Sequence, residues 1–134
     1  MGELRPTGVL DTNVFIDLAE LNEFALPEVS ALTTITLAEL QHGVAAAKDP
    51  TTHDMRNKRL GAAIVGYAPL PFDRQASTRY GSLIRLTIAA NRDPRSRKLD
   101  LMIAAIASCH DLPLYTRNPK DFVGLEQLVE VIEV

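Results

Sequence analysis

The stretch LDLMIAAIASCHDLPLYTRNPKD, residues 99–121, decides the fold because it passes from a helix pattern to a strand pattern and then to a turn. Apolar residues in its first part recur at helical spacing, and the alanines among them leave a thin helix that can pack closely on a sheet. The run at 113–116 is typical of a short strand, and Asn118-Pro119 predicts a new helical turn. A helix followed directly by such a strand predicts an α/β fold.

The rest of the chain shows the same alternation. Residues 8–10 are expected to form the end of a short strand, and further strands are expected at 31–35, 68–72 and 128–134. Helices are expected at 13–21, 36–47, 56–66, 74–90 and from 99 onward. Polar residues predict a loop at 48–53, and a basic loop is expected at 91–96. Strands that alternate with helices indicate βαβ units and a mostly parallel sheet.

Composition is that of one globular domain covering residues 1–134, with 46% hydrophobic and 23% charged residues. No apolar stretch approaches the roughly 18 to 20 residues that a membrane span needs, and the opening MGELRPTGVL lacks the apolar segment of a signal peptide. The single cysteine, Cys109, excludes an internal disulfide. These features favour the cytoplasm, and the net charge of −3 argues against a uniformly basic surface for nucleic acid.

Acidic residues stand where apolar runs give way to helix starts: Asp11, Glu39, Asp100 and Asp121. Each could be only a helix cap, and Glu39 in particular lies three residues after Thr36, as in a capping box. Helix starts that follow parallel strands nevertheless open on one edge of a sheet, so the four carboxylates are expected to converge there. Such a cluster is costly unless it binds a cation, and hard carboxylate oxygens suit Mg²⁺ or Mn²⁺.

Basic residues crowd the segment just before Asp100: Arg92, Arg95, Arg97 and Lys98. A run of this kind is usually solvated surface, but its position also suits the steering of a phosphate. The chain has no Walker loop and no G-x-G-x-x-G, and its histidines lack metal-ligand spacing. Phosphate-ester chemistry at a metal site is therefore the favoured activity.

The segments LDTNVFIDL, TTITLAELQHGV and LDLMIAAIASCHDLPLYTRNPKDF, with the final hydrophobic strand, resemble the PIN-domain ribonucleases and, within them, the VapC toxins of VapBC toxin–antitoxin pairs. The resemblance covers nearly the whole chain in order. It implies a three-layer α/β/α domain with a central sheet of four or five mostly parallel strands. Many relatives carry a glycine in the loop before Asp100, where this chain reads Arg92-Asp93-Pro94-Arg95-Ser96, so that loop is expected to differ.

The resemblance also implies roles for individual residues. The catalytic, metal-binding acids are Asp11, Glu39 and Asp100, with Asp121 preferred as the fourth and Asn118 as a supporting or direct oxygen ligand. Thr12, Asn13 and Thr116 are expected to orient the carboxylates. The basic residues that would contact RNA are Arg92, Arg95, Arg97, Lys98 and Arg117.

Members of the family hydrolyse RNA with a divalent metal, so the resemblance implies an endoribonuclease that uses Mg²⁺ or Mn²⁺ and is neutralised by a VapB-like antitoxin. A homodimer, which can assemble further with the antitoxin, is the expected state. The exposed apolar residues expected to meet the antitoxin are Phe15, Leu18 and Phe24. The sequence does not choose the target RNA, the number of ions or the dimer interface.

Two other functions fit parts of the sequence. A non-catalytic module could keep the same fold to bind RNA or protein. A phosphatase of the haloacid-dehalogenase type would use Asp11 as a covalent nucleophile, but that family has an aspartate two residues on, where this chain has Asn13, and a catalytic lysine with no clear equivalent here.

Overall fold

The computed structural model describes residues 6–134. The expectation that the opening segment is not a signal peptide falls partly on residues 1–5, which lie outside the described residues. The sheet has four strands in the order β2-β1-β3-β4, and every neighbouring pair is parallel. The strands are β1 (Thr7–Leu10), β2 (Val29–Ala31), β3 (Leu114–Thr116) and β4 (Val131–Glu133). The predicted mostly parallel α/β sheet is confirmed.

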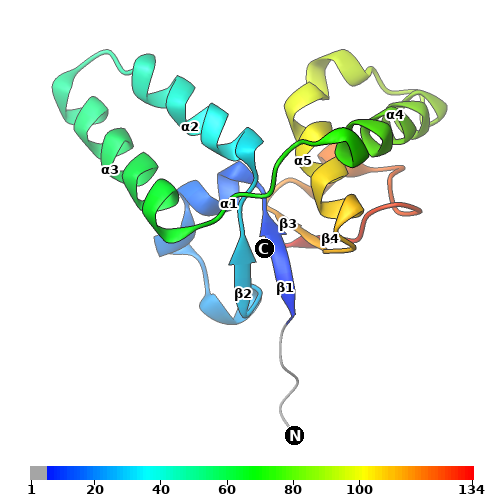
Figure 1. The fold of residues 1–134 in the computed structure, drawn as a ribbon, viewed down its shortest axis with the longest axis horizontal. Helices are drawn as coiled ribbons and strands as arrows, with labels where there is room; N and C mark the ends of the chain where they lie inside the picture. Colours follow the sequence, from blue (N-terminus) through cyan, green and yellow to red (C-terminus); the bar gives the residue numbers. More distant parts are fainter. Residues whose placement is uncertain (1–5) are drawn as a thin grey trace, which may run out of the picture.

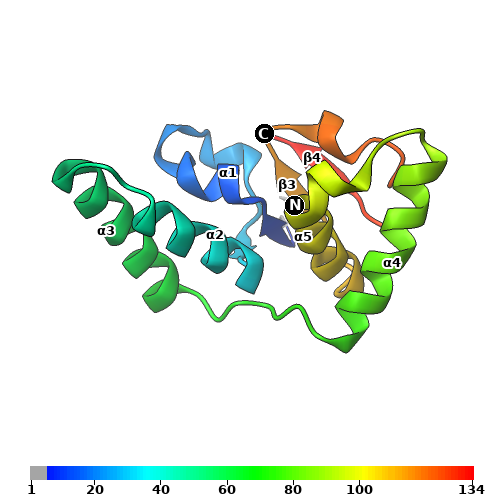
Figure 2. The same cartoon turned by 90° about the horizontal axis from the view of Figure 1, so that it is seen from above.

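Helices cover both faces of this sheet (Figures 1 and 2). They are α1 (Thr12–Ile16), α2 (Thr34–Ala45), α3 (Pro50–Gly66), α4 (Arg74–Ala89) and α5 (Lys98–Cys109). Short 3₁₀ turns, η1 to η4, lie at Leu18–Glu20, Glu23–Ala25, Pro94–Arg97 and Pro119–Phe122. Among the described residues, no helix is long and apolar enough to cross a membrane.

Alternating strand residues give the domain two cores. Val9 and Leu114 point into a cluster formed with α4 and α5, whereas Leu10 and Tyr115 point into a cluster formed with α1, α2 and α3. Successive side chains of a strand point to opposite faces, so a sheet covered on both sides has apolar residues at every position. The result is the three-layer α/β/α arrangement that was expected.

The glycine in β1 is required by this packing. A Cβ at Gly8 would lie within 2.7 Å of two ring carbons of Tyr115, well inside van der Waals contact. The bare backbone of β1 thus leaves room for an aromatic ring from the neighbouring strand β3, which belongs to the core beneath α1 and α2.

Several predicted boundaries are wrong, and helix caps explain two of them. The predicted strand 31–35 ends at Ala31 because the Thr33 hydroxyl accepts from the Thr36 N–H and starts α2, so Thr36 is not the cap and Glu39 is not its capping-box partner. The predicted loop at 48–53 is helical from Pro50 onward, because Asp49 caps α3 and Pro50 occupies its first turn. The extended segment at 68–72 is confirmed beside the end of β2, where Leu70 bridges Thr33.

Other differences lie at element ends. The first helix stops at Ile16 and continues as 3₁₀ turns, the loop at 91–96 contains the 3₁₀ turn Pro94–Arg97, and the last strand is limited to Val131–Glu133. In α4, Leu83 is fully buried, but Ile88, expected to face inward, is 57% exposed. Leu99, the first residue of the expected apolar stripe in α5, is also exposed.

Candidate metal centre

The four predicted acids come from four separate elements at the carboxyl edge of the sheet. Asp11 follows β1, Glu39 lies on α2, Asp100 is in the first turn of α5, and Asp121 lies in η4. The charges of the other three all raise the pKa of Asp100, which places the carboxylates within electrostatic reach of one another. The predicted convergence of these residues is therefore seen in the structure.

Asp11 is the most enclosed of the four, with 4% of its surface exposed. One carboxylate oxygen accepts from the Thr12 N–H at 2.9 Å, and the other accepts from the Thr116 hydroxyl at 2.8 Å. Burial is the main cause that raises its pKa, and these hydrogen bonds oppose that effect. Both oxygens are thus fixed in direction by the ends of β1 and β3.

Glu39 is oriented by a chain of hydroxyl groups. The Thr12 hydroxyl donates to Glu39 Oε1 at 2.5 Å and lies 2.9 Å from the Thr36 hydroxyl. Because the single proton of Thr12 is directed to the carboxylate, Thr36 must donate to Thr12. Thr12 and Thr116 therefore make the hydrogen bonds that the predicted orienting role requires, whereas the contact of Thr36 was missed because its residue type fitted a helix cap.

Asp100 differs from these two acids because no hydrogen bond to its carboxylate is recorded among residues 6–134. Its pKa is raised to about 6, mainly by burial and also by the charges of Asp11, Asp121 and Glu39, while the charge of Arg97 opposes this rise. A carboxylate in this position is short of positive charge and of donors. A bound cation would supply the missing charge.

Asp121 pairs with an arginine. Its Oδ1 lies 3.3 Å from Nη1 of Arg97, and both side chains are partly exposed. Asn118, the alternative fourth ligand, has an exposed side chain without a recorded hydrogen bond in the described part of the chain, and it does not cap η4. The charge of Asp121 raises the pKa of both Asp11 and Asp100, so its carboxylate lies within electrostatic reach of these two acids.

The remaining basic residues of the prediction differ in the partners that they bind. Arg92 donates to the Lys120 carbonyl, Arg95 pairs with Asp93, and Arg117 pairs with Asp17 at 2.7 Å. Lys98 is exposed and lines a hollow of about 290 Å³ that Glu39 and Asp100 also line. Basic side chains thus border the acidic edge, as expected for a site that receives a phosphate. The backbone N–H of Arg117 also reaches Asn13 Oδ1 at 3.4 Å.

The donor set fits a hard divalent cation in its chemistry. All four groups are carboxylates, the ligand type that Mg²⁺ and Mn²⁺ prefer, and their mutual repulsion would be relieved by a cation. Within residues 6–134, no three acidic, histidine or cysteine side chains are already arranged as a ligand set. Asp121 is engaged by Arg97, so a side-chain adjustment would accompany binding of the ion.

The prediction for the antitoxin surface needs correction. Phe15 is 7% exposed and packs edge-to-face on Tyr67, with ring centroids 5.7 Å apart. Leu18 packs partly against the same core, because the chain turns there into η1. Only Phe24, at 80% exposed, is available as expected.

Comparisons with known proteins find relatives that match the chain over nearly its whole length. No protein-family profile matches the chain. Ribonuclease VapC5 of Mycobacterium tuberculosis is 39% identical over an alignment of 141 positions that spans all of both proteins. VapBC-5 of the same organism, a member of the VapBC family of toxin–antitoxin systems, has a crystal structure that matches with a TM-score of 0.84 and 37% identity, over 96% of this chain and 98% of that one. FitAcB of Neisseria gonorrhoeae matches with a TM-score of 0.73 and 28% identity, over 92% and 95%.

Proposed function

The chain belongs to the VapC family of PIN-domain ribonucleases, and on that premise we propose that it is a divalent-metal-dependent endoribonuclease that acts as the toxin of a type II toxin–antitoxin pair. The observation that carries the proposal is the convergence of Asp11, Glu39, Asp100 and Asp121 at one edge of the sheet. A structural cap needs no second carboxylate near it, whereas four within mutual reach suit a cation-binding catalytic site.

The chain's own groups divide the work of the proposed site. When bound, Mg²⁺ or Mn²⁺ would activate water and stabilise charge on the phosphate. Asp11 and Asp100 are the proposed primary ligands, and Glu39 and Asp121 complete the site or orient the attacking water. Thr12 and Thr116 hold two of these carboxylates in place. Lys98, exposed at the same edge, is placed to attract the phosphate backbone of RNA.

The test of catalysis uses purified, antitoxin-free protein and total bacterial RNA, incubated with Mg²⁺, with Mn²⁺ or with EDTA. Discrete new 5′ ends that need metal and are absent with Asp11→Asn are the expected result. Asparagine is a matched replacement because its side-chain oxygen can still accept from Thr116 or the Thr12 N–H. Equal cleavage in EDTA would contradict the metal mechanism. A folded protein that binds metal but cuts no RNA would favour the binding-module alternative.

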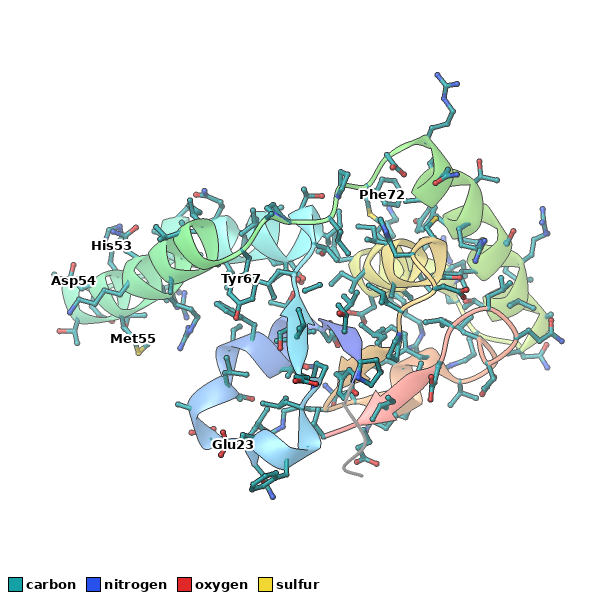
Figure 3. All side chains as sticks on the ribbon, turned by 60° about the horizontal axis from the view of Figure 1, so that its bottom comes forward. Glu23, His53, Asp54, Met55, Tyr67 and Phe72 are labelled. Atoms are coloured by element: carbon teal, nitrogen blue, oxygen red, sulfur yellow. The ribbon has the colours of Figure 1, made fainter. Side chains whose placement is uncertain are left out.

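The proposed surface for the antitoxin is a groove between α1, α2 and α3. It has a volume of about 450 Å³ and is lined by Ile16, Leu40 and Met55, with Arg56 and Arg59 along it and Glu39 at the catalytic end. Met55 lies near the end of α3 that is farthest from the sheet (Figure 3). A helical segment with apolar anchors would fit, with an acid for the arginines and a basic residue for the catalytic carboxylates.

A binding assay with the cognate antitoxin separates this groove from the exposed Phe24 of the original prediction. Met55→Glu is expected to weaken binding strongly, because it places a charge among the apolar anchors, whereas Phe24→Asp is expected to matter less. If only Phe24→Asp abolished binding of the antitoxin, the interface would lie at η2 and not in the groove. The homodimer and its assembly with the antitoxin, in the cytoplasm, complete the proposal, and light scattering of the purified protein measures the oligomeric state.

A further inference from the structure

Arg97 occupies an unusual position among the catalytic carboxylates. It precedes α5 and has an unwound backbone conformation, with φ −127° and ψ 20°, and its side chain is directed to Asp121 rather than to solvent. Only 22% of the side chain is exposed. The Nε atom is buried without a hydrogen-bond partner, the one such side-chain atom in residues 6–134.

A buried N–H without an acceptor is unfavourable, so some other interaction must hold the guanidinium in place. The surrounding negative charge supplies it, because Arg97 pairs with Asp121 and is also near enough to lower the pKa of Asp100. The loop itself is fastened to the same turn, since Arg92 donates to the Lys120 carbonyl next to Asp121. Arg97 is therefore held by the charge of the site despite its incomplete hydrogen bonding.

We propose that Arg97 is a positioning residue that serves as the internal counter-ion of the four carboxylates and must release Asp121 when a divalent ion binds. The inference rests on the proposed function only in requiring an ion at this site. It accounts for the position of Asp121, which Arg97 engages and which is therefore not free to act as a ligand beside the other acids. It also explains why Arg97 Nε lacks a hydrogen-bond partner: the side chain leaves its present position when the ion binds.

Metal affinity, measured by calorimetric titration with Mn²⁺, tests the exchange without any RNA. Arg97→Gln removes the competing charge and is expected to bind Mn²⁺ about fivefold more tightly, since a partly exposed ion pair is worth up to roughly 1 kcal/mol. Arg97→Lys keeps the charge and should stay within about twofold of wild type. Arg95→Gln is the matched control, because it removes a charge from the same loop at a residue that pairs only with Asp93 in the described structure.

An unchanged or weaker affinity in Arg97→Gln would overturn the proposal, because a residue that merely supports Asp121 would weaken binding when removed. Wild-type protein that binds no Mn²⁺ would overturn both this inference and the metal-dependent function, so the two failures are distinguishable. A second measurement needs no variant to fold. During Mg²⁺ titration of wild type, the NMR signal of the Arg97 Nε–H should shift in step with binding and that of Arg95 should not. A stationary Arg97 signal would also overturn the proposal.

Discussion

The two halves of the candidate site are built differently. Asp11 and Glu39, from the N-terminal half of the chain, accept hydrogen bonds from hydroxyl groups of Thr116 and Thr12. Asp100 and Asp121, from the C-terminal half, are free of such hydroxyl contacts in the described residues, and Arg97 supplies the nearest positive charge. One half is fixed by directional bonds, and the other is held by charge.

This difference indicates how the site can be both ordered and adaptable. Hydrogen bonds from strand ends and a helix fix the direction of each lone pair, so Asp11 and Glu39 form a prepared platform for an ion. A single, partly exposed ion pair such as Arg97–Asp121 contributes little free energy, so it can be exchanged for another partner at low cost. The C-terminal half can therefore adjust when an ion enters, and the following variants test each half separately.

The largest expected effect comes from Thr12→Val in the hydrogen-bonded half. It removes the hydroxyl that links Glu39 to Thr36 but keeps the backbone N–H that bonds Asp11. The cleavage rate of RNA should fall by about 10- to 100-fold, as for other groups that orient metal ligands. Thr12→Ser restores the hydroxyl and should retain most activity. Full activity in a folded Thr12→Val protein would show that the hydroxyl chain does not position Glu39.

Asp100→Asn tests the charge-held half through stability. A folded-state pKa of about 6, against an ordinary 3.8, means that ionised Asp100 opposes folding of the metal-free protein. This cost is fully present above about pH 6 and disappears as the pH falls toward 3.8. In EDTA the variant should therefore melt at a higher temperature than wild type at neutral pH, and the gain should shrink in acid.

The contrary result for Asp100→Asn is equally informative. A lower melting temperature in EDTA at neutral pH would mean that the carboxylate makes a stabilising contact and is not short of charge. Asp49→Asn serves as a control, because Asp49 caps α3 on the surface, away from the cluster, and asparagine caps almost as well.

The smallest effect is expected at Arg117→Gln, which tests whether every arginine near the site serves it. Arg117 pairs with Asp17 at the end of α1, and both side chains are partly exposed. Loss of the pair should cost about 0.5 kcal/mol in the free energy of unfolding by urea and leave Mn²⁺ affinity unchanged. A clear change in Mn²⁺ affinity would mean that Arg117 also acts on the metal site, and it would contradict the claim that Arg97 differs from the other arginines in this respect.

The sequence predicted the fold and the convergence of the four acids for the same reason, which is that both depend on local patterns. Apolar runs and helical spacing fix the order of strands and helices, and parallel strands bring the residues after them to one edge. Residue type alone did not decide between Thr33 and Thr36 as the cap of α2, because either hydroxyl can cap a helix. The start of α2 therefore differs from the prediction, and the Thr36 hydroxyl contacts Thr12 instead of capping the helix.

Contacts between distant segments could not be predicted in the same way. The burial of Phe15 depends on Tyr67, which lies more than fifty residues away in the sequence. The local pattern LDTNVFIDL does not predict that contact. The Arg97–Asp121 pair depends on how the loop before α5 folds back onto η4. The basic residues were recognised as a group, but their individual partners required the three-dimensional arrangement.

The most direct test of the account is calorimetric titration of Mn²⁺ into wild type, Asp11→Asn and Asp100→Asn, which changes one carboxylate in each half. If the two halves form one site, each variant should weaken the same binding event by at least about tenfold, since each loses a charged ligand. Wild-type affinity in Asp100→Asn, with binding lost only in Asp11→Asn, would contradict the claim that the charge-held half is part of the metal site.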